Sequence, residues 1–192
     1  MTVDVQIVRL KMLCEYSLGV FFVFTYMRSA IEPKVIQVLR IVTGKLKGKN
    51  VSWVLIGSTS LALQGVDIKP KDVDILTSKG GAFEIGELLK EYEVEPVRLK
   101  KSELFESFFG EFNVNGIEVE VMGDMKEKVC DKWVSLSSRL VCPKIVEIEG
   151  MRIPVSSLLE QQKSYEQLGR RKDPVRVRKI NEALRRAEEN VD

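Results

Sequence analysis

Two apolar segments, the first of which ends in a short helical pattern, constrain the fold of this chain more than any other feature. The first run reads WVLIGSTSLALQG and the second reads KDVDIL. This pattern predicts a buried strand that turns at Gly57 and Ser58 into a short helix, followed by a second buried strand. That second strand contains Asp72 and Asp74, although carboxylates are seldom buried without a partner.

Asp72 and Asp74 are two residues apart, so in a strand both side chains point to one face. Val73 and Ile75 then point to the other face and pack into the core. Two carboxylates held this close repel each other and raise their pKa values unless a cation is present. Oxygen ligands favour magnesium or manganese. An edge strand with one solvated face would give the same pattern.

A third acidic position comes from the segment GIEVEVMGD, which follows an Asn-Gly turn. In this alternating pattern Val119 and Val121 point one way, and Glu118 and Glu120 point the other. If this strand pairs beside KDVDIL, one of the glutamates can reach the same metal site. A half-exposed antiparallel strand would produce the same alternation.

The turn at Gly57 and Ser58 is a candidate anion site. The first N–H groups of a helix have no partner inside the helix, and the helix dipole favours negative charge there. Glycine lets a phosphate approach the backbone closely, and the hydroxyls of Ser58, Thr59 and Ser60 are further donors. Ser58 could equally be a simple N-cap residue.

Apolar periodicity and turn signals place the other elements before residue 156. We expect a helix over residues 32–46, and a helix in GAFEIGELLKEY with Phe83, Ile85, Leu88 and Leu89 on its inner side. VEPVRL predicts a strand, and two hairpins are predicted to turn at Asn115-Gly116 and at Glu149-Gly150. Residues 126–143 give no clear pattern.

The C-terminal part reads as two helices. Ser157 and Glu160 have the spacing of a capping box for a helix that ends at Gly169. Asp173, which precedes a proline, opens a last helix that ends near Glu188. The predicted fold class is therefore α+β, with a mixed β-sheet flanked by helices and a C-terminal helical pair.

Composition limits the chemistry. The chain of 192 residues has no histidine, which excludes histidine-based catalysis and histidine-ligated zinc. Its three cysteines, Cys14, Cys130 and Cys142, are scattered and indicate reduced thiols in the cytoplasm. A net charge of +2 gives no electrostatic case for binding a membrane or nucleic acid.

Residues 1–26 include the apolar run YSLGVFFVFTY, which is too short to span a bilayer. Three interpretations stay open. The segment could pack on the domain as a strand or helix, it could reflect a start codon chosen upstream of a natural start at Met27, or it could be a membrane anchor.

The order of strand, Gly-Ser turn, short helix, DxD strand and later acidic strand resembles the DNA polymerase beta-like nucleotidyltransferase superfamily, in particular its small stand-alone members. The resemblance extends from about residue 27 to residue 172. It implies a nucleotidyltransferase-like sheet domain at residues 27–155, followed by a C-terminal helical segment at residues 156–192. It also implies that Asp72, Asp74 and Glu120 are catalytic and bind Mg²⁺ or Mn²⁺.

The same resemblance implies a nucleotide site. Gly57 and Ser58 would bind phosphates, and the segment KSYEQLGRRKD would add Lys163, Arg170 and Lys172. A solvated basic helix end is the alternative for these three residues. The chain departs from the superfamily pattern in two places, because its third acid is glutamate where aspartate is usual, and DIKPK stands where many relatives have an arginine and a threonine.

The implied function is transfer of a nucleoside monophosphate from an NTP, with ATP favoured, to an acceptor hydroxyl with release of pyrophosphate. The acceptor could be a small molecule, RNA or protein. One alternative is a toxin–antitoxin-type regulatory protein that acts with a protein partner. The other is a non-catalytic nucleotide-binding module, which the two departures suggest. The oligomeric state stays open.

Overall fold

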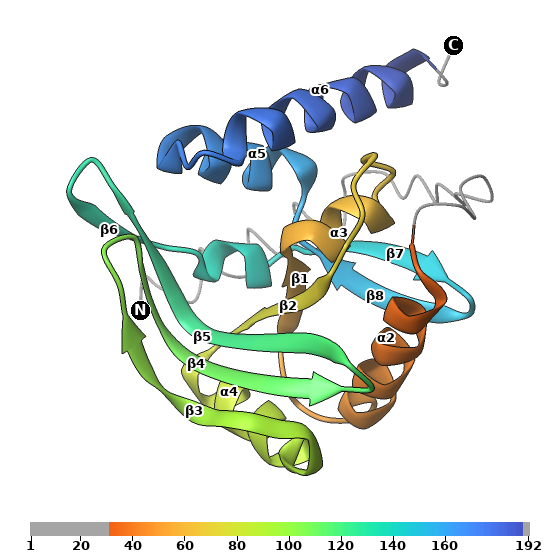
Figure 1. The fold of residues 1–192 in the computed structure, drawn as a ribbon, viewed down its shortest axis with the longest axis vertical. Coiled ribbons are helices and arrows are strands. Elements are labelled where there is room, and N and C mark those ends of the chain that lie inside the picture. The colour runs from red at the N-terminus through yellow and green to blue at the C-terminus, as the bar shows by residue number, and fades with distance from the viewer. Residues whose placement is uncertain (1–30, 190–192) are drawn as a thin grey trace, which may run out of the picture.

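The computed structural model describes residues 31–189, so our expectations for residues 1–26 lie outside the described part of the chain. Across residues 31–189 the chain forms an eight-stranded mixed sheet of order β3-β4-β5-β2-β1-β8-β7, with β6 paired to β5 (Figure 1). The strands are β1 (Trp53–Ile56), β2 (Asp72–Thr77), β3 (Glu93–Lys101), β4 (Phe105–Val114), β5 (Ile117–Val129), β6 (Lys132–Ser135), β7 (Lys144–Ile148) and β8 (Met151–Val155). The helices are α2 (Pro33–Leu46), α3 (Gly57–Leu63), α4 (Lys79–Leu88), α5 (Leu158–Leu168) and α6 (Asp173–Glu189), with short 3₁₀ turns η1 (Lys90–Tyr92) and η2 (Ser137–Leu140).

Helices lie on both faces of this sheet. Helices α2 and α4 cover one face, whereas α5 and α6 lie beyond the other face with α3 beneath them (Figure 1). The main core fills the space under α2 and α4, where Leu39, Val73, Ile75 and Val121 are fully buried. The predicted α+β class, with a flanked mixed sheet and a C-terminal helical pair, is confirmed.

Turn and cap residues fix the boundaries as the sequence predicted. The β4–β5 hairpin turns at Asn115 and Gly116, both with positive φ, which matches the Asn-Gly signal. The Ser157–Glu160 capping box at the start of α5 is complete. Gly169 ends α5 in a left-handed conformation, with φ of 56°. These elements carry the C-terminal helices back over the sheet.

The structure corrects the prediction for Phe83, which is 43% exposed and not on the inner side of α4. The buried stripe of α4 follows Ala82 and Ile85 instead, so Phe83 is turned about 100° from Ala82. Its ring lies beside Phe108, with ring centroids 5.9 Å apart. The stretch without a clear pattern extends β5 and adds β6 and η2.

Cys130 is exposed and free, whereas Cys14 lies outside the described part of the chain, so the expectation of three reduced thiols stays a prediction. No helix within residues 31–189 combines the length and the apolar character needed to cross a membrane.

Candidate active site

The candidate site begins with two adjacent strands. Strands β2 and β5 pair in parallel, with Asp74 opposite Glu120 and Asp72 opposite Glu118. Because directly opposed residues share a face, all four carboxylates lie on the side of the sheet away from α2 and α4. Asp72, Asp74 and Glu120 line one cavity, whereas Glu118 is exposed and does not line it.

The turn between β1 and α3 presses against this acidic cluster. Gly57 has φ of +69°, and a Cβ atom built on it would lie 1.8 Å from Oδ2 of Asp74. A side chain at this position would therefore displace the carboxylate. Glycine is required both by the backbone conformation and by the close approach of Asp74.

Hydroxyl groups of α3 hold the first aspartate. Ser58 Oγ donates a hydrogen bond of 2.6 Å to Oδ1 of Asp72, and Thr59 Oγ1 donates to the backbone carbonyl of Asp72. The N-cap of α3 is Ile56, without a side-chain cap bond, so Ser58 does not act as the N-cap. Its side chain instead orients a carboxylate.

The carboxylates are held against their own repulsion. Burial raises the pKa of Asp74 well above its ordinary value of 3.8, and the charges of Asp72 and Glu120 raise it further. Burial also raises the pKa of Glu120, although a hydrogen bond with Asp74 opposes this effect. Excess negative charge at this place favours a proton or a cation.

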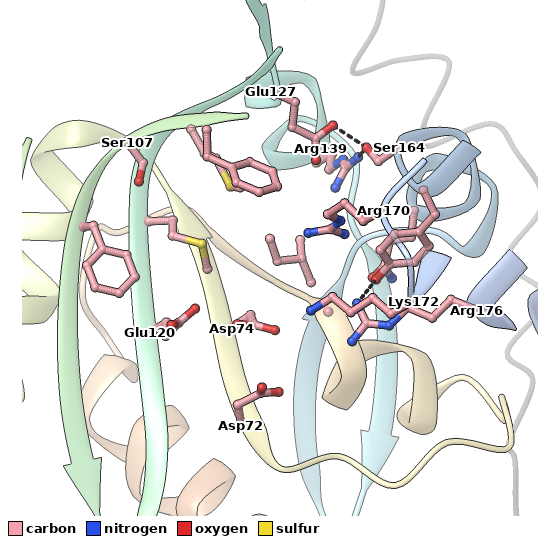
Figure 2. Close-up of a pocket in the computed structure, with 18 residues that line it drawn as sticks. Asp72, Asp74, Ser107, Glu120, Glu127, Arg139, Ser164, Arg170, Lys172 and Arg176 are labelled. Atoms are coloured by element: carbon pink, nitrogen blue, oxygen red, sulfur yellow. Dashed lines mark hydrogen bonds between the residues drawn. The ribbon is translucent and has the colours of Figure 1, made fainter. Parts of the chain in front are cut away.

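The cavity has a volume of about 330 Å³, within the range of roughly 300–1,000 Å³ that is typical of small-molecule sites. Figure 2 shows the carboxylates on one side and basic side chains from the α5–α6 region on the other. The residues that line it are Ile56, Gly57, Asp72, Asp74, Phe105, Ser107, Phe109, Glu120, Met122, Met125, Glu127, Arg139, Gln161, Ser164, Tyr165, Arg170, Lys172 and Arg176.

The basic wall contains three cations near the start of α6. Arg170 is anchored by Asp173, which accepts hydrogen bonds of 2.9 Å from the backbone N–H and from Nε of Arg170. Lys172 and Arg176 make no ion pair within the described residues. The charge of Arg176 lowers the pKa of Asp74, so it acts across the cavity on the acidic cluster. These cations face the carboxylates from the other side of the cavity (Figure 2).

The residues predicted for nucleotide binding separate into two groups. Gly57, Arg170 and Lys172 line the cavity. Ser58 is buried behind it, and Lys163 is exposed on α5 and does not line it.

Several lining residues were not predicted. Arg139 comes from the stretch without a clear pattern, and Glu127 lies where β5 was not expected to continue. For Arg176 a signal could have been used, because it lies one helical turn after Lys172.

A divalent cation fits the chemistry of this donor set. As the side chains stand in residues 31–189, no group of three or more His, Cys, Asp or Glu residues is arranged so that it could hold a metal ion. The oxygen-only donors and the raised pKa of Asp74 both suit a hard cation. The carboxylates would have to close around such an ion.

The sheet order, the Gly-Ser turn and the opposed carboxylates define the nucleotidyltransferase class, as the sequence predicted. The family model described as aminoglycoside-2''-adenylyltransferase matches residues 38–180, and the chain belongs to this family. A candidate nucleotidyltransferase from Thermotoga maritima shares 38% identity with a TM-score of 0.71, over 81% of this chain and 98% of that chain.

Two antibiotic-modifying enzymes have a similar fold. ANT(2'')-Ia, solved in complex with adenylyl-2''-tobramycin, has a TM-score of 0.50 at 9% identity, over 82% of this chain and 93% of that chain. The lincosamide antibiotic adenylyltransferase LnuA, solved with lincomycin bound, has a TM-score of 0.50 at 9% identity, over 80% of this chain and 98% of that chain. At this identity the likeness concerns the fold alone. No curated protein sequence matches the chain.

Proposed function

We propose that this protein is a metal-dependent nucleotidyltransferase that moves a nucleoside monophosphate from an NTP to an acceptor hydroxyl and releases pyrophosphate. The register of β2 and β5 carries this proposal, because it places Asp74 opposite Glu120 on the face where Asp72 also lines the cavity. A basic wall across the same cavity supplies the charge that a triphosphate needs.

Asp72, Asp74 and Glu120 would hold Mg²⁺ or Mn²⁺. Such an ion, when bound, neutralises charge on the triphosphate and lowers the pKa of an acceptor hydroxyl. The raised pKa of Asp74 supports this assignment, because burial and the charges of Asp72 and Glu120 raise it more than the charge of Arg176 lowers it.

The chain's own groups have separate tasks. Gly57 lets the β1–α3 turn pack directly against the Asp74 carboxylate, which a side chain at this position would displace. Lys172 and Arg176 would neutralise the phosphate oxygens, and the anchored Arg170 would do so in a fixed orientation. Ser58 keeps Asp72 in place. Together these groups contribute positioning and charge stabilisation, which dominate phosphoryl-type transfer.

The acceptor is open to three classes, which are small hydroxylated molecules, RNA and proteins. Small molecules come first in our proposal, because the two antibiotic-modifying enzymes of the same fold were solved with small-molecule antibiotics or an adenylylated product. ATP comes first among the nucleotides, because the matching family is described as an adenylyltransferase.

The deciding experiment incubates the protein with each α-labelled NTP, Mg²⁺ or Mn²⁺, and fractionated host lysate, and then follows label transfer and pyrophosphate release. Asp72→Ala and Asp74→Ala should abolish transfer while the domain stays folded. Glu84→Gln is the matched control, because Glu84 is exposed on α4 at the opposite face of the sheet. Full turnover by either aspartate variant would refute the assignment. NTP binding without any pyrophosphate release would favour the non-catalytic alternative.

A further inference from the structure

The cavity has a second polar end that the proposed phosphate chemistry does not use. Glu127 of β5, Arg139 of η2 and Ser164 of α5 lie together at this end, away from Asp72 and Asp74 (Figure 2). We call these three residues the distal triad. Each of the three is only 6% exposed. Burying charged groups is costly, so their burial beside an open cavity calls for an explanation.

The triad is joined by hydrogen bonds that leave several of its groups unused. Arg139 Nη2 donates to Ser164 Oγ and to the backbone carbonyl of Glu160, and Ser164 Oγ donates to Glu127 Oε2 at 2.7 Å. Within the described residues, Nε and Nη1 of Arg139 make no hydrogen bond, and Oε1 of Glu127 accepts none. The triad therefore offers donors and an acceptor to a ligand.

A fourth polar group has a buried atom without a partner. The amide Nε2 of Gln161 donates to Ser60 Oγ at 2.9 Å and to the backbone carbonyl of Ser156 at 3.1 Å, which fixes the orientation of the amide. Its Oε1 is buried and accepts no hydrogen bond. Gln161 is 1% exposed and lines the same cavity. An unpaired buried acceptor is costly unless a ligand supplies a donor.

Two aromatic rings and a guanidinium line the cavity as well. The guanidinium carbon of Arg170 lies 5.3 Å from the ring centroid of Phe105 and 5.8 Å from that of Tyr165. Asp173 anchors this guanidinium, so its position beside the two rings is fixed. Aromatic rings and guanidinium planes are the surfaces on which nucleobases stack.

We propose that the distal end of the cavity binds the nucleobase of the NTP through the triad and Gln161, and that it favours bases with an exocyclic amine. This inference rests on the proposed function. An exocyclic amine supplies two N–H donors for the unpaired acceptors of Glu127 and Gln161, and a neighbouring ring acceptor meets the free donors of Arg139. Uracil has no exocyclic amine and would therefore bind more weakly. A non-planar acceptor molecule would gain little from contact with the planar groups of Phe105, Arg170 and Tyr165, so these groups favour a nucleobase as the occupant.

The test compares a ligand that has a base with one that has none. Calorimetry with Mg²⁺ measures the affinity of the purified protein for ATP, CTP, GTP, UTP and inorganic triphosphate. Glu127→Gln and Arg139→Gln should weaken ATP binding about tenfold or more and leave triphosphate binding unchanged. Lys172→Gln should weaken both ligands alike, and the exposed Glu84→Gln should change neither. UTP should bind most weakly of the four nucleotides.

Glu127→Gln is the primary variant, because glutamine has the same shape and can still accept a hydrogen bond from Ser164. Folding should therefore survive this change, whereas Arg139→Gln removes a charge that η2 holds in a buried position. Equal losses for ATP and triphosphate, or no loss for either, would overturn the nucleobase assignment. A change confined to the KM of the acceptor would overturn it as well and would place the acceptor there. Loss of transfer in Asp74→Ala with intact base selectivity in the wild-type protein would support both proposals. Failure of any NTP to bind would overturn both.

Discussion

Gly57 gives the sharpest test of the site's geometry. Replacing it by alanine imposes two penalties that can be separated. The first is conformational, because φ of +69° is unfavourable for an L side chain and costs roughly 1–2 kcal/mol. The second is a collision, because the new Cβ would lie 1.8 Å from Oδ2 and 2.8 Å from Cγ of Asp74. Either the carboxylate or the turn has to move.

Gly48→Ala is the matched control. Gly48 has φ of +76°, and no heavy atom lies within 4 Å of a Cβ built there. This variant therefore pays the conformational penalty without the collision. We expect Gly57→Ala to lower the free energy of unfolding by a further 1–3 kcal/mol, roughly the cost of overpacking. In an Asp74→Ala background, where the colliding oxygen is absent, that extra loss should largely disappear.

Two assays read the outcome. Urea unfolding of the single and double variants gives the stability differences. Label transfer from an α-labelled NTP gives the activity, which should fall about 100-fold for Gly57→Ala, since a displacement near 1 Å at a reacting site costs this much. Gly48→Ala should keep wild-type activity. If Gly57→Ala were as stable as Gly48→Ala and equally active, the close approach of Gly57 to Asp74 would have no functional meaning.

Three further predictions follow from the same contacts. Asp74→Asn should stabilise the metal-free protein near neutral pH. Because the pKa of Asp74 is raised in the folded state, the wild type loses stability as the pH rises above 3.8, by about 1.4 kcal/mol for each unit by which the pKa is raised. Urea unfolding at a series of pH values from acid to neutral measures this loss, and parallel pH dependences for the two proteins would contradict it. Ser58→Ala should lower kcat roughly 10- to 100-fold with little change in the KM of the NTP, because Ser58 orients Asp72. Steady-state kinetics measure both constants, and an unchanged kcat would show that Asp72 does not need this hydrogen bond. Lys172→Gln should raise the KM of the NTP about tenfold, whereas Lys163→Gln should not change it; equal effects of both would mean that the cavity is not the nucleotide site.

The acidic cluster was predictable because a strand alternates with a period of two. That period alone places Asp72 and Asp74 on one face, and it places Glu120 on the face opposite Val119 and Val121. The alternation does not tell which strand pairs with β2. The parallel pairing of β2 and β5, which brings Glu120 beside Asp74, depends on how the whole sheet assembles.

The position of Lys163 shows a helical signal that the sequence analysis did not use. The buried side of α5 follows Leu158, Gln161, Ser164 and Tyr165, which is the spacing of one helical face. Lys163 lies off that face and is exposed. The prediction of Lys163 came from a family resemblance in the local sequence. The helical period points instead to Gln161, Ser164 and Tyr165, all of which line the cavity.

Arg139 marks the limit of what local sequence patterns can predict. Sequence patterns identify buried positions by their apolar character, and an arginine between polar residues reads as solvated. Its burial here depends on partners more than 20 residues away, Ser164 and the carbonyl of Glu160. Burial lowers the pKa of Arg139, so the folded chain bears a cost for keeping this charge beside the cavity. An apolar residue would avoid that cost, and the retained guanidinium is therefore best explained by a ligand that uses its free donors.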